Sequence, residues 1–249
     1  CRTALAQHTT SPDYHTSGAW VAVAVAGVAA RIMGLNRTQT AHAMGIAEYH
    51  GPRSQMMRCI DHPTMVKDGS GWGAMCGVSA ARMAKAGFTG APALTLQTEH
   101  WQDLGVDWLI LQQYFKPYPV CRWAQGPIAA VLDLKARHKF SSQDVTGLHI
   151  VSFHEAVRLG QKNAITTEEA QYLISFPCAL ALVHGTVMPQ HVADEALGNP
   201  EVQRLSAVLS MDEDNYANRL FPLQRMARAE ITLHAGDILK SGWFEPKWD

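Results

Sequence analysis

Residues 61–77 read DHPTMVKDGSGWGAMCG, a glycine-rich loop that runs into an alanine-rich helical pattern ending near Ala86. The start of a buried helix presents unpaired backbone N–H groups and a partial positive charge, and both suit an anion. Glycine allows close approach of the backbone, and Lys67 adds a full positive charge just before the turn. The stretch predicts a cradle for a carboxylate or phosphate, or else a plain turn with a solvated lysine. It is not a P-loop, because the required residue order is absent.

The residues on both sides of this loop are patterned as helices. The expected helices are 18–33, 39–48 and 71–86. Thr16 or Ser17 can cap the first helix, and Gly34 closes it. Because its apolar residues lie nearly all round, we expect this helix to be buried among others. Gly73 and Gly77 have a spacing that permits helices to cross closely.

The second half of the chain mixes helices and strands. The expected helices are 127–138, 166–184 and 200–209, and the expected strands are 108–111, 148–153, 228–234 and 238–244. The segment Lys116-Pro117-Tyr118-Pro119 cannot lie inside a regular helix, so we expect a domain boundary there. The sequence therefore predicts an α+β protein, with part of a helical domain at 1–112 and an α+β domain at 113–249.

Composition limits the class of protein. Of 249 residues, 47% are apolar and 17% charged, which is enough apolar material for a substantial core and too little charge for a disordered chain. A net charge of −1 excludes a global field that would attract nucleic acid or anionic lipid. The apolar run 19–30 is too short to span a bilayer. Five widely spaced cysteines indicate free thiols in a reducing compartment, so we expect a cytoplasmic protein without a membrane segment.

Histidines are numerous but not arranged as metal ligands. None of the twelve has the spacing of a strong metal signature, so metal-assisted hydrolysis is only a third hypothesis. His15 precedes a buried helix and can act as a general base or donate to an anionic substrate; it can equally fix the helix entrance. His62, in the loop, has the same two interpretations. His154 follows a predicted strand and faces either a cleft or solvent.

Lys116 and Arg122 are the candidate anion binders of the second half. Pro117 and Pro119 stiffen the backbone beside Lys116 and can aim its ammonium group into an interdomain cleft, where ligand sites often form. Together with Lys67, these residues can bind a di- or tricarboxylate, with Arg122 binding bidentately. The alternative is ordinary surface charge.

Two other chemistries rest on single residues. Cys121 could be a nucleophile, but nothing in the sequence marks a base to pair with it. A pyridoxal-phosphate lysine at Lys67 could use the glycine- and serine-rich turn to hold the phosphate, but no second element of such a site is visible.

Several short motifs occur in the order found in one known family. They are DYHTSG at 13–18, MVKDG at 65–69, KAGFTG at 85–90, FKPYP at 115–119, SFHEA at 152–156 and TEEAQY at 167–172. Through these motifs the chain resembles the MmgE/PrpD family over nearly its whole length.

The resemblance implies a fold and a chemistry. The family has a large all-helical domain, a smaller α+β lid domain and a cleft between them, and its members form homodimers that need no metal or other cofactor. It includes 2-methylcitrate dehydratase, cis-aconitate decarboxylase and an iminodisuccinate epimerase, which act on small polycarboxylates. Carried over by motif, His15, Lys67 and Lys116 are the expected catalytic residues. Lys67, Lys116, Arg122 and His154 are the expected substrate-binding residues.

The chain also departs from the family pattern. The turn at 67–71 differs from the decarboxylase-type Lys-x-x-His-x-Gly turn and is one residue shorter, so the resemblance does not select decarboxylation. Because the chain begins at Cys1 rather than Met, we expect a fragment of a longer protein. The expected function is that of a lyase or isomerase, most simply a hydro-lyase like 2-methylcitrate dehydratase, or a related decarboxylase or epimerase. The alternative is a non-catalytic family member, or an incomplete fragment, that only binds or assembles.

Overall fold

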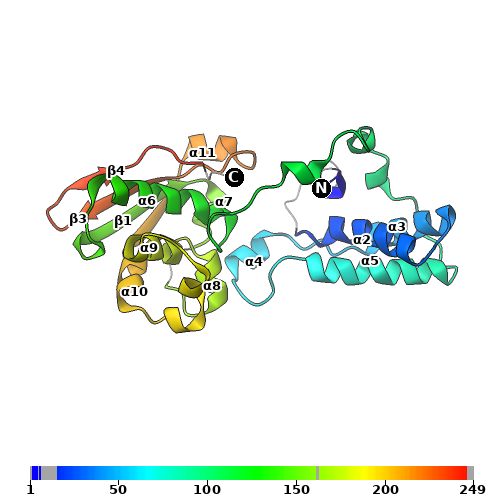
Figure 1. Ribbon diagram of the computed structural model, residues 1–249, viewed down its shortest axis with the longest axis horizontal. Coiled ribbons are helices and arrows are strands. Elements are labelled where there is room, and N and C mark those ends of the chain that lie inside the picture. Colours follow the sequence, from blue (N-terminus) through cyan, green and yellow to red (C-terminus); the bar gives the residue numbers. More distant parts are fainter. Residues whose placement is uncertain (1, 5, 7–15, 161–162, 246–249) are drawn as a thin grey trace. The chain divides into compact units, whose positions relative to one another are not determined.

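The structure is a computed structural model that describes residues 2–4, 6, 16–160 and 163–245. Its contacts divide the chain into two compact units (Figure 1). Unit 1 comprises Cys1–Cys59 and Val66–Gln113, and unit 2 comprises Ile60–Met65 and Tyr114–Asp249. All four strands of the described residues lie in unit 2, so the chain is of the α+β class. The assignment of domains to 1–112 and 113–249 stays a prediction.

Unit 1 is built on three helices, α2 (Gly18–Ile32), α3 (Arg37–His50) and α5 (Ser70–Lys85). These match the expected helices to within two residues at each end. Asn36 and Gln39 form a capping box that fixes the start of α3. The core between the helices consists mainly of alanines, namely Ala22, Ala26, Ala29, Ala30, Ala43, Ala47, Ala80, Ala81 and Ala84. Such small side chains allow the helix axes to approach closely.

Helices α2 and α5 cross at glycines, as the sequence predicts. A Cβ atom added to Gly73 would lie 2.4 Å from the carbonyl oxygen of Gly18, and one added to Gly77 would lie 2.5 Å from that of Ala22. Only glycine permits such contacts between backbones. Because successive positions on α5 meet successive positions on α2, the two helices run parallel and begin side by side (Figure 1).

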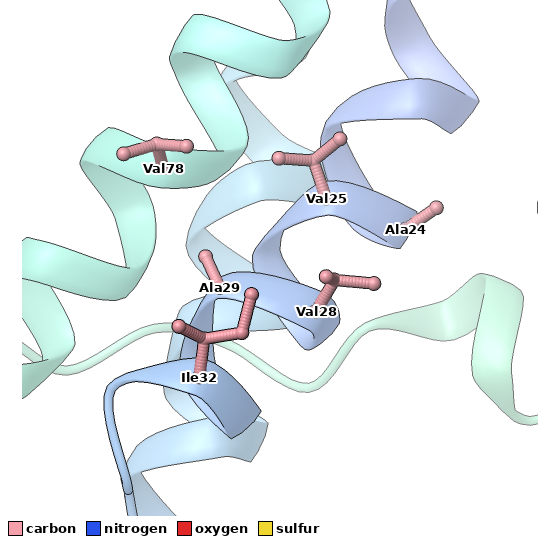
Figure 2. Close-up of a pocket in the computed structure, with 6 residues that line it drawn as sticks. All are labelled: Ala24, Val25, Val28, Ala29, Ile32 and Val78. Atoms are coloured by element: carbon pink, nitrogen blue, oxygen red, sulfur yellow. The ribbon is translucent and has the colours of Figure 1, made fainter.

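The expectation that α2 is buried on all sides is wrong. Val28 and Ile32 are 60% and 80% exposed. Among the described elements, those that pack extensively against α2 are α3 and α5, and they leave this side of the helix uncovered. The exposed side forms an apolar groove with α5 (Figure 2). The groove is lined by Ala24, Val25, Val28, Ala29, Ile32 and Val78.

The prediction of a strand at 108–111 is also wrong. This segment forms the short 3₁₀ helix η3 (Leu109–Gln112), after two similar turns, η1 (Leu94–Leu96) and η2 (Glu99–Trp101). The N–H of Leu111 donates to the carbonyl of Trp108 at 2.8 Å, a turn-forming hydrogen bond that an extended strand cannot make. The apolar run resembles a strand in composition, but Ile110 and Leu111 are exposed.

Unit 2 contains a four-stranded mixed sheet in the order β2-β1-β3-β4. Its strands are β1 (Val145–Ser152), β2 (Leu209–Glu213), β3 (Arg228–Leu233) and β4 (Ile238–Lys240). Strand β1 pairs in parallel with β2 and antiparallel with β3, and β3 pairs antiparallel with β4. The expected strands at 148–153 and 228–234 are therefore confirmed. The expected strand at 238–244 is confirmed in its first three residues, and Phe244 forms an isolated bridge with Ala227.

Helices α6 (Gln125–His138), α9 (Ser175–His184) and α10 (Pro200–Ala207) pack against one another and the sheet. Leu148 and Ile150 of β1 are fully buried. Three further short helices are α4 (Met57–Asp61), α7 (His154–Val157) and α11 (Asn215–Leu220). No helix of the described residues combines the length and the apolar character needed to cross a bilayer.

The single long helix expected at 166–184 is instead two helices, α8 (Thr167–Tyr172) and α9. Pro177 explains the break. Within a continuous helix, its ring would clash with the carbonyl of Leu173, and it has no N–H to donate there. Leu173 accordingly adopts an extended conformation, with ψ of 133°. The expected cap is confirmed, since Thr166 Oγ1 accepts from the N–H of Glu169 at 3.2 Å.

A histidine pair at the end of α9 makes the stability of unit 2 depend on pH. The rings of His184 and His191 stack with centroids 4.2 Å apart. Burial, followed by the charges of His191 and Lys135, lowers the pKa of His184. The unfolded chain therefore binds a proton more readily than the folded chain. The contribution of His184 to stability is full at high pH, and it is lost as pH falls below about 6.5 towards the folded pKa.

We therefore expect His184→Gln to reduce the loss of stability on acidification. Urea unfolding of the wild type and the variant between pH 8.5 and 5.5 measures this, with the glutamine variant showing the shallower decline below pH 6.5. The two curves should run parallel above pH 8, which serves as the internal control. Parallel curves throughout the range would contradict the role of His184.

Candidate functional site

The loop that carries Lys67 lies against the start of α2. Lys67 is half-buried, and Gly69 caps α5 two residues later. A Cβ atom added to Gly69 would lie 2.7 Å from the backbone nitrogen of Gly18 and 2.7 Å from Thr16 Oγ1. The fold thus brings Thr16 and Gly18, at the end of the first motif, against Gly69, at the end of the second, through contacts that exclude any side chain at Gly69.

Asp68 ties these two motifs by hydrogen bonds. Its Oδ1 accepts from the N–H of Ser17 at 3.1 Å, from Ser17 Oγ at 2.6 Å and from the N–H of Gly69 at 3.0 Å. Ser17 Oγ also lies 2.6 Å from Ser70 Oγ. A carboxylate suits this position, because the positive ends of two helix dipoles meet there. The anion cradle expected from the sequence is therefore partly filled by a carboxylate of the chain itself.

Lys116 belongs to a tight loop at the start of unit 2. Its Nζ donates to the carbonyl of Val120 at 3.0 Å. The buried amide of Gln125 organises the same loop, because its Nε2 donates to the carbonyls of Tyr118 and Val120 while its Oε1 accepts from the N–H of Tyr118. Burial raises the pKa of Tyr118. The side chain of Lys116 is exposed, and the hydrogen bond to Val120 fixes the position of its ammonium group.

Arg122 lies on the same segment, in the 3₁₀ helix η4 (Arg122–Ala124). Its guanidinium group stacks over the ring of Tyr114 at 4.2 Å from the centroid, a cation–π contact. The N–H of Cys121, the residue before it, donates to the carbonyl of Gln171 at 2.7 Å, so the loop is also anchored to α8. The structure therefore gathers Lys116, Arg122 and the end of the TEEAQY motif in one part of unit 2.

His154 lies at the carboxyl end of the parallel pair β1 and β2. Its Nδ1 is 3.0 Å from Glu213 Oε2, and its backbone N–H donates to Asn218 Oδ1 at 2.7 Å. Asn218 Nδ2 donates to the same Glu213 oxygen at 3.4 Å. A histidine whose Nδ1 faces a carboxylate presents Nε2 outward, which is how many histidine bases and ligands are oriented.

An aromatic cluster links the segments on which Arg122 and His154 lie. The ring of Trp123 meets those of Phe153 and Phe221 edge-on, with centroids 5.7 and 5.8 Å apart, and the two phenylalanines stack at 4.4 Å. Trp123 and Phe153 are buried. Because each is the direct neighbour of a candidate residue, this packing restrains the backbone at both.

The remaining candidates from the sequence are two histidines, the cysteines and a metal site. His15 lies outside the described residues, and His62 is exposed. Of the described residues, Cys59, Cys76, Cys121 and Cys178 are not joined in disulfides. Burial raises the pKa of Cys76 and Cys178. Within residues 2–4, 6, 16–160 and 163–245, no group of three or more His, Cys, Asp or Glu side chains is arranged to hold a metal ion.

Comparison with known families accounts for both halves of the chain. Residues 1–108 match the family model described as the MmgE/PrpD N-terminal domain, and residues 118–246 match that of the MmgE/PrpD C-terminal domain. The chain belongs to the MmgE/PrpD family. A search among curated proteins found no match. Lys67 lies within the N-terminal match, whereas Lys116 lies between the two matches, just before the C-terminal match begins at residue 118.

Some residues of these MmgE/PrpD loops were missed by reasoning from sequence. Among the expectations from sequence, Asp68 is included only as part of a motif and Ser17 only as part of a motif and as a possible helix cap, while Glu213 and Asn218 are not included. Their partners lie 51 to 64 positions away along the chain, so no local pattern reveals the pairing. For Asp68 a signal existed, because an acidic residue just before a helix N-terminus is well placed to bind backbone N–H groups.

Proposed function

We propose that the protein is a lyase or isomerase that acts on a small polycarboxylate. The observation that carries this proposal is membership of the MmgE/PrpD family along both halves of the chain. The bond changes occur at a carbon next to a carboxylate, as dehydration, decarboxylation or epimerisation. Dehydration in the manner of 2-methylcitrate dehydratase is the leading candidate.

The proposed chemistry requires positive charge near the substrate. Removing a proton from the carbon beside a carboxylate builds negative charge on that carboxylate. In dehydration, the C–H electron pair forms the new double bond, the C–O bond breaks, and the hydroxide leaves with a proton as water. We propose that Lys67 and Lys116 stabilise this charge, the kind of electrostatic contribution that is usually the largest in such reactions.

Three other residues have proposed roles. Arg122 and His154 bind substrate carboxylates, and the outward Nε2 of His154 supports such a role because Glu213 engages Nδ1. His15 acts as base, acid or carboxylate donor, on the strength of its motif alone. The finer family properties also remain proposals: a large helical domain with a smaller α+β lid domain, a homodimer, a cytoplasmic location and a reaction without metal or other cofactor.

The apolar groove of Figure 2 does not suit this substrate. Its six lining residues are alanine, valine and isoleucine, and a polycarboxylate would lose its hydration there without gaining a charged partner. This contrast supports the charged loops, rather than the groove, as the place of substrate binding.

Turnover of candidate acids tests the proposed function. The protein, purified at its full natural length, is incubated with 2-methylcitrate, citrate and cis-aconitate, and products are identified by NMR. We expect one of these acids to be converted. Exchange of solvent deuterium into an acid without net conversion would indicate epimerisation. No conversion and no exchange with any small polycarboxylate would contradict the proposal and favour a non-catalytic role.

A further inference from the structure

We propose that Asp68 is a positioning residue for Lys67, a role that rests on the proposed function. Its carboxylate occupies the place where the N-termini of α2 and α5 meet, and it thereby fixes the loop that carries the lysine. The inference comes from three hydrogen bonds to one carboxylate oxygen, two from Ser17 and one from Gly69.

The hydrogen bonds of the Asp68 carboxylate connect segments that are far apart in the sequence. Asp68 is bonded directly to Lys67 along the chain, while Ser17 lies immediately before α2, 51 positions earlier. The short contact between Ser17 Oγ and Ser70 Oγ extends the network to the first residue of α5. One side chain therefore connects the lysine loop to the beginnings of both long helices.

Glycine packing makes the loop sensitive to loss of this bridge. The backbones of Gly18 and Gly69 are in direct contact, and glycine does not restrict its own φ and ψ angles. The residues from Asp68 to Gly71, which join the loop to the first turn of α5, include two glycines and a serine. Its conformation near Lys67 thus depends on hydrogen bonds rather than on side-chain packing, and charge-assisted hydrogen bonds are the strongest available.

This role differs from that of substrate binding. Asp68 is an anion, so it repels the carboxylates of the proposed substrate, and its hydrogen-bond donors belong to the protein. Its carboxylate binds the N-terminus of α2 in place of an external anion. In the proposed reaction, Lys67 is the cation of this loop that acts on the substrate. Asp68 therefore affects turnover through the placement of the Lys67 ammonium group.

Chemical rescue tests the inference directly. Asp68→Ala removes the equivalent of one formate ion, and we expect turnover to fall by about 100-fold, the effect of misplacing a catalytic group by about 1 Å. Adding formate should restore most of the lost turnover, because the ion can occupy the vacated position. Asp68→Asn keeps an oxygen acceptor in the same shape, so its turnover should lie between those of the wild type and the alanine variant.

Asp107→Ala is the matched control. Asp107 is another acid of unit 1, and its carboxylate accepts from Gln112 rather than from α2 or α5. Its replacement should leave turnover unchanged, with no response to formate. Formate should also raise the Tm of Asp68→Ala but not that of Asp107→Ala, a readout that does not depend on activity.

The outcomes separate this inference from the proposed function. If the wild type converts an acid and Asp68→Ala converts it equally well, the positioning role is wrong and the proposed function stands. Low turnover of folded Asp68→Ala that formate does not restore would also overturn the role. If Asp68→Ala does not fold, wild-type turnover by Asp68→Asn and by Ser17→Ala would overturn it instead. If the wild type converts no acid, the proposed function and the positioning role fall together.

Discussion

Replacing Lys67 by alanine should lower turnover of the proposed polycarboxylate substrate by about 100-fold or more, the usual cost of removing one group that stabilises developing negative charge. The same loss is expected for Lys116→Ala. The physical reason is that the charge on the substrate carboxylate grows as the neighbouring proton leaves, so an ammonium group binds the transition state more tightly than the ground state. Steady-state kinetics on the full-length protein should therefore show a fall in kcat, with a smaller change in KM.

Lys85→Ala provides the control for this experiment. Lys85 is the last residue of α5, so it lies at the end of that helix opposite to the loop that carries Lys67. Its removal should change neither kcat nor KM. Wild-type turnover by Lys67→Ala would show that its ammonium group has no part in the reaction, whichever substrate is converted.

Replacing Gly77 by alanine should destabilise unit 1. The added Cβ atom would lie 2.5 Å from the carbonyl oxygen of Ala22 and 2.8 Å from the backbone nitrogen of Ala26. Both are backbone atoms of α2, so relief requires the two helices to move apart. Overpacking of this kind costs about 1–3 kcal/mol, which exceeds the gain of up to about 1 kcal/mol from the better helix propensity of alanine. Urea unfolding measures the change in the free energy of unfolding.

Gly71→Ala, on the same helix, should have the opposite sign. A Cβ atom at Gly71 meets nothing within 4 Å, so only the propensity gain remains. Because Gly71 is the second residue of α5, this gain should be at most the value of about 0.5–1 kcal/mol that applies to a helix interior. Comparing Gly77→Ala with Gly71→Ala separates the cost of a clash between the helices from the effect of glycine on helix propensity. Equal stabilisation by both substitutions would mean that α2 and α5 are not in close contact at Gly77.

The expected helices of unit 1 are confirmed because their signals are local. Asn36 with Gln39 forms a capping box, and Gly34 and Gly87 both have positive φ angles at the helix ends. Each of these features depends on residues within four positions of one another, which is the range over which helix hydrogen bonds form. The hairpin β3–β4 is likewise local, with Gly236 in its turn.

The errors arise where distant residues decide the structure. Leu209 was assigned to the end of a helix, but it begins β2, because parallel pairing with β1 joins residues 61 positions apart. The break before α9 had a local signal in Pro177 that the pattern of apolar residues concealed. The exposed side of α2 was misjudged because periodicity describes which residues are apolar, and it does not determine how many neighbouring helices cover them.

For the candidate site, the sequence by itself determined the family, because motif order is a property of the chain. The two lysine loops as a binding site and an anionic substrate are predictions from the charges of the same motifs. Only the tertiary structure decided that Asp68 binds the start of α2, that Glu213 engages His154 and that Gln125 shapes the Lys116 loop. The physical reason is that hydrogen bonds act only over short distances in space. A hydrogen bond needs its two atoms within about 3.2 Å, and for residues far apart in the chain only the packing of helices and strands brings them there.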